Sequence, residues 1–482
     1  MGLLDKIKDE QNYTLTENDA LAYESTKSAL VDLFAIAGAM RERDDSEIID
    51  KFAKAMAEDN LLATRIAFYT RDVRGGLGER RSGRLMLHYL AVNYPAIFRK
   101  NLEYIVDYGR WDDLVYLLKD MPDDIVLIIK KQLEQDLKDM ADNKPVSLMA
   151  KWLPSVNTSN YETVKMGRFL AKELGMSEKQ YRKTLSSLRR YINVVEVNLS
   201  AKRYEDIIYP EVPSLAMNRY RKAFKRNDEE RFDDYLQKVS TGEAKINASV
   251  LYPYDIVEKY LYHVNGVDPV LEEQWKALPN YVEGENKFLI MADVSGSMYG
   301  RPMATSVGLS IYFASRNKGP FANHFMTFSA EPKLVEIKGN NLYEQIRYII
   351  RAEWGMNTNL EAAFRLLLYT AVKHKVPKQD MPQSIVVITD MEIDACTSPD
   401  WTLYDLMKKD FEANGYDLPN IVFWNVNSRN NTYHASFDRK GVQLASGQST
   451  VVFESLVKGL DLTPYDYMLT VINAPRYERI TV

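Results

Sequence analysis

Two carboxylates and three hydroxyls in the C-terminal half of the sequence have the types and spacing of ligands for a hard divalent cation. Asp293 follows the apolar stretch FLIMA, and the pattern Asp-x-Ser-x-Ser continues with Ser295 and Ser297. Alternate residues of an extended loop point the same way, so these three side chains can turn their oxygens toward one point. Thr358 and Asp390, from two later segments, add to an all-oxygen shell suited to Mg²⁺, with Mn²⁺ or Ca²⁺ as alternatives. The shell is incomplete and leaves one position for an oxygen from a partner.

The segments around these residues predict a doubly wound, mostly parallel sheet. Apolar strands are expected in KFLIMADV, QSIVVITD and NIVFWNVN, and a strand pair in NHFMTFSA and KLVEIKG. Amphipathic helices lie between them, and such alternation indicates a sheet covered on both faces. Ligands of these sheets bind at the carboxyl ends of the strands, which is where Asp293 and Asp390 are expected.

This arrangement resembles the metal-ion-dependent adhesion site of von Willebrand factor A domains. DVSGSM matches the Asp-x-Ser-x-Ser signature, Thr358 the second-loop Thr, and Asp390 in VVITDME the third-loop Asp. The resemblance implies a bound divalent ion with one position left for a carboxylate from a protein partner. Many members place Gly after the third-loop Asp, whereas this chain has Met391 followed by Glu392. An intact fold with an empty site therefore stays open as an alternative.

Catalysis by the serines has little support in the sequence. An α/β-hydrolase elbow needs Gly-x-Ser-x-Gly after a strand, and the frame around Ser295 lacks the first Gly. His324 falls within a predicted strand and His374 ends a predicted helix, so neither is placed like the base of a triad. HEXXH, paired CxxC and Walker patterns are absent from the sequence. The sequence predicts a protein without enzymatic activity.

The N-terminal half has a different pattern of apolar residues. Apolar residues recur at spacings of three and four through successive segments, which predicts amphipathic helices separated by short breaks. We expect a HEAT-like helical repeat domain over 15–280, with an irregular helical domain as the alternative. The sheet domain follows over 285–465, and a C-terminal segment over 466–482 is expected to pack back on one of the two domains.

An arginine-rich, glycine-rich stretch is the second chemical signal. In TRIAFYTRDVRGGLGERRSGR, exposed backbone N–H groups beside guanidinium groups suit a phosphate or another anion. The arginines are Arg65, Arg71, Arg74, Arg80, Arg81 and Arg84. The alternative is an inter-helix turn whose arginines are solvated or paired with nearby acids. The acids available for such pairs are Asp72, Glu79, Asp112 and Asp113.

RDVRGGLGERR followed by YGRWDDL resembles the helical part of the TROVE family, which includes the Ro proteins. In Ro proteins a ring of HEAT-like repeats precedes a von Willebrand A domain, the same order as here. The chain is also similar to an uncharacterised group of plant, fungal, bacterial and viral proteins, which shares AKWLPS, YRKTLSSLRRYINVVE, FWNVNS and SGQS. The Ro resemblance implies binding of small structured RNA or of single-stranded RNA.

Further basic residues are candidates for that RNA contact. They are Arg182, Lys183, Arg189, Arg190, Lys202, Arg203, Arg219, Arg221 and Lys222. Tyr181, Tyr204, Tyr220 and Phe224 are interleaved with them and could stack on bases. The alternative is a set of ordinary solvated helix faces, which the net charge of −5 favours because phosphate neutralisation supplies most RNA affinity.

Composition limits the remaining choices. A single cysteine, Cys396, excludes an internal disulfide and fits the reducing cytoplasm. The first residues lack the apolar core of a signal peptide, and no run of 18 apolar residues predicts a membrane span. Two functions remain: an RNA-binding scaffold with a divalent-metal site, or a metal-dependent protein-interaction module without RNA.

Overall fold

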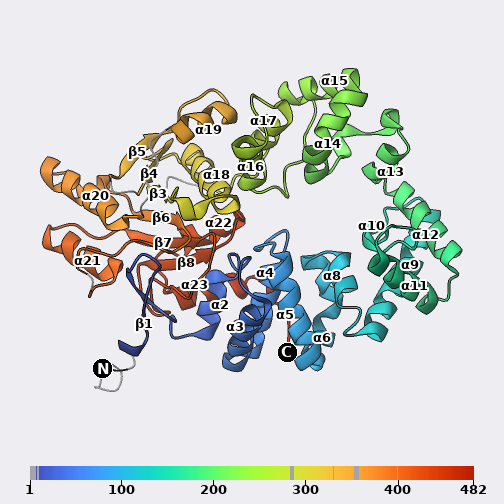
Figure 1. Cartoon of the computed structure of the whole chain (residues 1–482), viewed down its shortest axis with the longest axis horizontal. Helices are drawn as coiled ribbons and strands as arrows, with labels where there is room; N and C mark the ends of the chain where they lie inside the picture. Colours follow the sequence, from blue (N-terminus) through green and yellow to red (C-terminus); the bar gives the residue numbers. More distant parts are fainter. Residues whose placement is uncertain (1–6, 8–9, 283–286, 329–330, 352–357, 399) are drawn as a thin grey trace.

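The computed structural model describes residues 7, 10–282, 287–328, 331–351, 358–398 and 400–482. A helical region is followed by a domain built on a six-stranded, mostly parallel sheet, as predicted. The boundary expected between residues 280 and 285 lies partly outside the described residues. Figure 1 shows the helices running in a ring that begins and ends on the sheet domain.

The helical region consists of short helices joined by tight connections. They are α2 (Ala29–Ile36), α3 (Asp45–Glu58), α4 (Asn60–Arg71), α5 (Arg80–Asn93), α6 (Pro95–Asn101), α7 (Ile105–Tyr108), α8 (Trp111–Tyr116), α9 (Pro122–Ala141), α10 (Met149–Trp152), α11 (Tyr161–Glu173), α12 (Glu178–Tyr191), α13 (Val195–Ser200), α14 (Ser214–Asn227), α15 (Glu229–Ser240), α16 (Pro253–Tyr262) and α17 (Pro269–Lys276).

Local sequence explains where these helices start. Asp59 caps α4 by accepting from the N–H of Leu62, and Ser177 forms a capping box with Gln180 at the start of α12. The apolar faces of most helices join one continuous core that extends into the sheet domain. A separate core holds the part of the ring from Val195 to Ile246 together and also includes Val270. The ring therefore contains one locally packed unit on the side away from the sheet.

The sheet has the order β5-β4-β3-β6-β7-β8, with β4 and β5 antiparallel and the other neighbours parallel. Its strands are β3 (Phe288–Ala292), β4 (His324–Thr327), β5 (Lys333–Glu336), β6 (Ser384–Thr389), β7 (Asn420–Asn425) and β8 (Val442–Ser446). The helices of this domain are α18 (Arg301–Arg316), α19 (Leu342–Arg351), α20 (Leu360–His374), α21 (Leu403–Ala413) and α22 (Val451–Lys458). The order reverses between β3 and β6, so the switch point of the sheet lies there.

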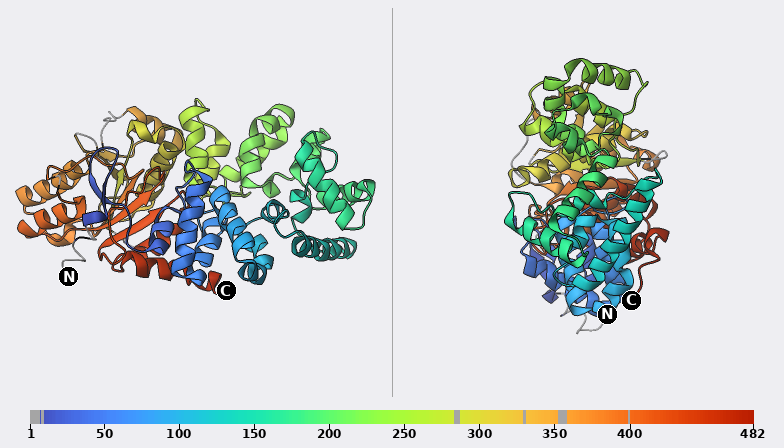
Figure 2. Two further views of the ribbon diagram at one scale, coloured as in Figure 1. Left: turned by 60° about the horizontal axis from the view of Figure 1, so that its bottom comes forward. Right: turned by 90° about the vertical axis from the view of Figure 1, so that its right-hand side faces the viewer.

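Both ends of the chain close the ring. A hairpin of β1 (Tyr13–Leu15) and β2 (Leu21–Tyr23) lies on the sheet domain, where Tyr23 bridges Tyr433. The C-terminal helix α23 (Pro464–Ile472) packs against α2, α4 and β8. The two further views agree that the red C-terminal end lies beside the blue N-terminal helices (Figure 2). None of the helices in the described part of the chain combines the length and apolar character that a membrane span needs.

Candidate functional site: the carboxyl edge of the sheet and the basic ring

Asp293 and Asp390 follow the two strands that flank the switch point, as the sequence predicted. β3 and β6 pair in parallel from Phe288↔Ser384 to Ala292↔Ile388, which brings their carboxyl ends to one edge. The Asp293 N–H donates to the carbonyl of Ile388 at 2.9 Å. Both carboxylates are buried. This edge is the position at which sheets of this type bind ligands.

Four of the five predicted oxygen ligands meet at this edge. The Asp293 carboxylate accepts from the Ser295 N–H at 2.9 Å and from the Thr389 hydroxyl at 2.6 Å. The hydroxyls of Ser295 and Ser297 lie 3.0 Å apart. The Ser297 hydroxyl also acts to lower the pKa of the Asp390 carboxyl, against the effect of burial. Ser297 is exposed, so the cluster is open to solvent on that side.

The two buried carboxylates repel each other when both are ionised. Burial, reinforced by the negative charge of Asp390, raises the pKa of Asp293 to about 6. Burial also raises the pKa of Asp390, although Arg429 opposes the shift. Burial raises the pKa of nearby Glu392 as well. A cation between Asp293 and Asp390 would relieve this repulsion.

Thr358, the fifth predicted ligand, is held by other partners. Its hydroxyl lies 2.7 Å from the Asp394 carboxylate, 3.1 Å from the Glu392 carbonyl and 3.0 Å from the Asn18 amide nitrogen. Asn359 caps the following helix α20 by accepting from the Ala362 N–H. Thr358 is thus tied to the loop that follows Asp390, and within the described residues no hydrogen bond joins it to Asp293, Ser295 or Ser297.

Arg429 is a neighbour of the site that sequence reasoning missed. One of its terminal nitrogens donates to Asp390 and to Glu17, at 3.0 Å in both cases. Arg429 lies directly after FWNVNS, one of the stretches shared with the uncharacterised group, and this is the only signal that could have pointed to it. Asn18 and Glu17 come from the N-terminal hairpin and carried no signal.

The residues at the edge fit a hard divalent cation in donor type. Their side chains offer only oxygen, from Asp293, Asp390 and two serine hydroxyls, and Mg²⁺ prefers such ligands. Among the residues that the structure describes, no group of three or more His, Cys, Asp or Glu side chains gathers as a metal cluster. The site therefore depends on hydroxyls beside two carboxylates, with Arg429 as the competing positive charge.

His434, buried behind the Asp390 loop, predicts a pH effect on stability. It hydrogen-bonds the Met391 carbonyl at 3.1 Å, and burial lowers its pKa to about 4. Because His434 stays neutral in the folded protein, the free energy of unfolding is unaffected by it above pH 6.5. As the pH falls from 6.5 toward 4, the unfolded state binds a proton that the folded state does not, and the free energy of unfolding decreases by up to about 3 kcal/mol. We expect His434→Gln to remove this part of the acid destabilisation.

The measurement is the difference in urea-unfolding midpoint between wild type and the His434 variant at pH 8, 6 and 4.5. The raised pKa of Asp293 acts in the opposite direction over part of this range, and it cancels in the comparison. A constant difference at all three pH values would show that the pKa of His434 is the same in the folded and the unfolded protein.

The arginine-rich stretch forms ion pairs rather than an open cluster. Arg71 is buried and pairs with Asp113 at 2.7 Å. Arg84 bridges Asp112 and Asp113, and Arg80 also pairs with Asp112. The remaining three also have partners: Arg81 pairs with Asp45, Arg74 donates to the Asp107 carbonyl, and Arg65 donates to Asn473. These contacts largely agree with the alternative in which the arginines are paired with nearby acids.

The glycine-rich turn contacts the C-terminal segment of the chain. We call residues 72–79 the closure loop. Asp72 is fully buried and accepts from Arg476 and from the Tyr477 hydroxyl, both of the C-terminal segment. Gly78 has φ +68°, and a Cβ there would lie 2.2 Å from the Tyr252 hydroxyl. Gly78 therefore permits the close approach of the closure loop to Tyr252, the residue before α16.

The other basic candidates divide into inward and outward groups. Arg189 donates to two carbonyls and to Ser155, and Arg221 pairs with Asp268 at 2.7 Å, so both support the fold. Arg203 pairs with Asp206. The exposed candidates that lack an acidic partner among the described residues are Arg182, Lys183, Arg190, Lys202, Arg219 and Lys222.

The predicted stacking aromatics need a correction. Tyr181 and Phe224 are buried in the cores of the ring, so the expectation that they stack on bases is wrong. They sit on the apolar faces of α12 and α14, where the helical period points them inward. Tyr204 and Tyr220 are only half-buried. Basic side chains of the same helices such as Arg182 and Lys222 are exposed, whereas Arg189 and Arg221 are held by internal partners.

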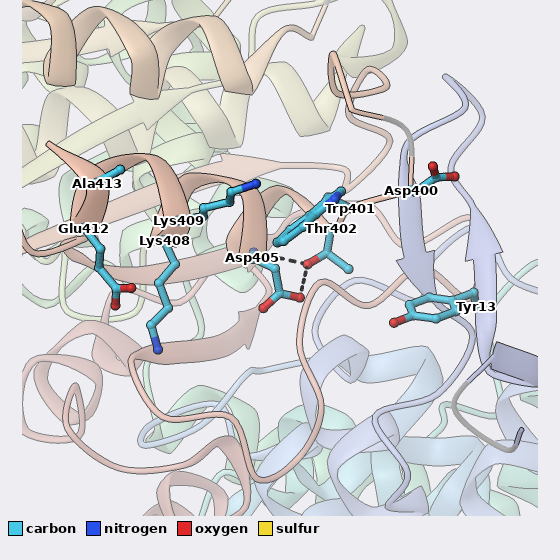
Figure 3. A pocket seen from close by; sticks show the side chains of 9 residues that line it. All are labelled: Tyr13, Asp400, Trp401, Thr402, Asp405, Lys408, Lys409, Glu412 and Ala413. Carbon is cyan, nitrogen blue, oxygen red and sulfur yellow. Dashed lines mark hydrogen bonds between the residues drawn. The ribbon is translucent and has the colours of Figure 1, made fainter. Parts of the chain in front are cut away.

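A separate depression lies beside α21 (Figure 3). Lys409 lies over the ring of Trp401 at 4.7 Å, and Asp405 accepts from Thr402 and pairs with Arg439. Its lining mixes both charge signs. This surface favours no single class of ligand.

Comparisons with known proteins agree with this architecture. The family described as "Domain of unknown function (DUF2828)" matches residues 16–126 and 168–287, and that described as "Domain of unknown function (DUF7788)" matches 287–462. An uncharacterised protein of Acanthamoeba polyphaga mimivirus is 26% identical over 502 residues, covering 96% of this chain and 87% of that protein. The crystal structure of the Deinococcus radiodurans RO (RSR) protein covers 93% of this chain and 99% of its own, with a TM-score of 0.50 and 14% identity. This chain shares the Ro-like fold.

Proposed function

We propose that this protein is a non-enzymatic, ring-shaped scaffold that binds RNA, and that its sheet domain is of the von Willebrand A type with a divalent cation at the Asp293–Asp390 edge. The exposed basic residues of α12 and α14 are the observation that carries the RNA proposal. Helices α12 and α14 lie in the part of the ring that is separated from the sheet by other helices (Figure 1). Their side chains can neutralise phosphates without first breaking an ion pair.

The alternative is a metal-dependent protein-interaction module without RNA. The juxtaposed carboxylates of Asp293 and Asp390 favour it, because two buried acids beside serine hydroxyls suit a dication. In that case a partner's carboxylate binds at the ion and the basic face is only a solvated surface. Both functions use the same cation site, so the RNA experiment decides between them.

The triple charge reversal Arg182→Glu, Lys183→Glu and Arg190→Glu is expected to weaken RNA binding by at least about tenfold at low salt. All three side chains are exposed on α12. If each contacts one phosphate, the slope of log affinity against log salt becomes shallower by about 2–3. The measurement is fluorescence anisotropy of a labelled RNA hairpin with a single-stranded tail, titrated at several salt concentrations.

The matched control reverses three exposed lysines of the sheet domain, Lys318, Lys408 and Lys440. It changes net charge equally but leaves the ring unaltered, so affinity and slope should stay near wild type. Equal losses of RNA affinity in the two triple variants would show that the effect comes from overall charge and not from the α12 face. Unchanged binding in the α12 triple would remove this basic face as an RNA contact.

Asp293→Asn is expected to abolish Mn²⁺ binding at the sheet edge. The substitution removes one of two anionic ligands while keeping the size and some hydrogen bonding of the side chain. Electron paramagnetic resonance of Mn²⁺ titrated into the protein measures the bound fraction directly. Asp380→Asn, an exposed acid of the same domain, is the control. Equal Mn²⁺ binding by both variants would contradict a cation site at Asp293.

A further inference from the structure

The turn of the N-terminal hairpin lies across the carboxyl edge of the sheet. The Thr16 hydroxyl donates to the Ile393 carbonyl at 2.7 Å, and the Ala395 N–H donates to the Asn18 carbonyl at 3.0 Å. Asp19 and Asp394 form a β-bridge. Backbone hydrogen bonds therefore fix this turn directly beside the loop that carries Asp390.

The turn also makes hydrogen bonds to Thr358 and to Glu392, in the segments beside the candidate cation site. Asn18 donates to the Thr358 hydroxyl at 3.0 Å and to the Glu392 carbonyl at 2.7 Å. The Glu17 N–H donates to the Glu392 carboxylate at 2.6 Å. Asn18 thus links the Thr358 segment to the Glu392 segment, although both lie more than 300 positions away from it in the sequence.

The Glu17 carboxylate is held in one place by two donors. Arg429 donates to one oxygen at 3.0 Å, and Asn430 donates to the other at 2.9 Å. Because the same Arg429 nitrogen also lies 3.0 Å from Asp390, the bonded oxygens of Glu17 and Asp390 are at most twice 3.0 Å apart. The Glu17 side chain keeps about half of its exposure, at 47%.

We propose that the N-terminal hairpin is an intramolecular partner of the cation site, with Glu17 supplying the carboxylate that a separate protein would otherwise bring. This inference rests on the proposed divalent site. A carboxylate tethered beside the ion has a high effective concentration and loses little entropy on binding. An external carboxylate must therefore displace Glu17, so the hairpin limits access of partner proteins to this edge.

The experiment compares wild type with Glu17→Ala, and with Glu17→Gln as a variant that preserves side-chain size. Glu24→Ala is the matched control, because it removes one exposed negative charge from the same hairpin. Mn²⁺ alone is the first probe, followed by Mn²⁺ with sodium acetate as the competing carboxylate. Electron paramagnetic resonance gives the Mn²⁺ affinity in each case, at constant ionic strength.

We expect both Glu17 variants to bind Mn²⁺ on the order of tenfold more weakly than wild type and the Glu24 control. Acetate should restore affinity in the Glu17 variants and leave wild type unchanged. The proposal is overturned if Glu17 and Glu24 variants behave alike, or if acetate strengthens Mn²⁺ binding equally in wild type. Asp293→Asn distinguishes failure of the hairpin proposal from failure of the cation site. If Asp293→Asn also binds Mn²⁺ as wild type does, the cation site itself is refuted.

Discussion

Asp72→Ala is expected to destabilise the protein by about 3–5 kcal/mol and to release the C-terminal segment from the ring. The Asp72 carboxylate has no exposed surface and accepts from the Arg476 guanidinium, from the Tyr477 hydroxyl at 2.9 Å, and from the N–H groups of Arg74 and Gly75. Alanine leaves a buried hydroxyl and two backbone donors without their acceptor. A half-buried guanidinium loses its counter-charge.

Urea unfolding followed by circular dichroism measures the loss, and limited proteolysis reports whether residues after 472 become accessible first. Asp107→Ala is the control, because Asp107 pairs with Arg479 of the same C-terminal segment in an exposed bridge at 2.8 Å. Exposed pairs contribute only about 0–1 kcal/mol. Similar losses in the two variants would mean that Asp72 does not anchor the segment.

The elements of the sheet domain could be predicted because their signals are local. FLIMA and SIVVIT are continuous apolar runs, and β3 and β6 form within them. Strands that are buried on both faces read this way in any α/β sheet. The placement of Asp293 and Asp390 at one edge then follows from parallel pairing alone. No knowledge of side-chain contacts was needed for that step.

The rest of the site depends on contacts between distant segments, which the sequence does not display. Arg429 reaches Asp390 from the loop after β7, and Asn18 reaches Thr358 across 340 positions. The arginine-rich stretch is the converse case. Its arginines suggested an anion site, but Arg71 meets Asp113 only after α4, α7 and α8 have packed together. Composition reveals the charges, and only the tertiary fold decides which of them are paired.

Gly38→Ala is expected to cost about 3 kcal/mol or more, because it separates the N-terminal helices from the sheet. A Cβ on Gly38 would lie 2.6 Å from the Cα of Gly447 and 2.8 Å from the backbone carbon of Ser446. These are backbone atoms next to β8, so no side-chain rotation relieves the overlap. The Gly38 N–H also donates to the Ser446 hydroxyl at 2.9 Å, and this bond lengthens when the surfaces part.

Gly175→Ala is the matched control. Gly175 has φ +69° with no atom within 4 Å of an added Cβ, so its substitution costs only the backbone penalty of about 1–2 kcal/mol. Urea-unfolding midpoints of the two variants measure the difference. If Gly38→Ala is no worse than Gly175→Ala, the contact between the turn after α2 and β8 is not tightly packed.

The double variant Gly38→Ala with Asp72→Ala tests whether both sites belong to one joint. Leu77 of the closure loop lies 3.5 Å from the position of an added Cβ on Gly447, the residue that faces Gly38. Neighbouring sites that share a packed contact couple by about 0.5–3 kcal/mol. Helix α23 of the C-terminal segment packs against α2 and β8, the elements that meet at Gly38. Release of that segment by Asp72→Ala already weakens this contact, so the double variant should lose less than the two single losses combined. Full additivity would place the two contacts in separate, independently opening interfaces.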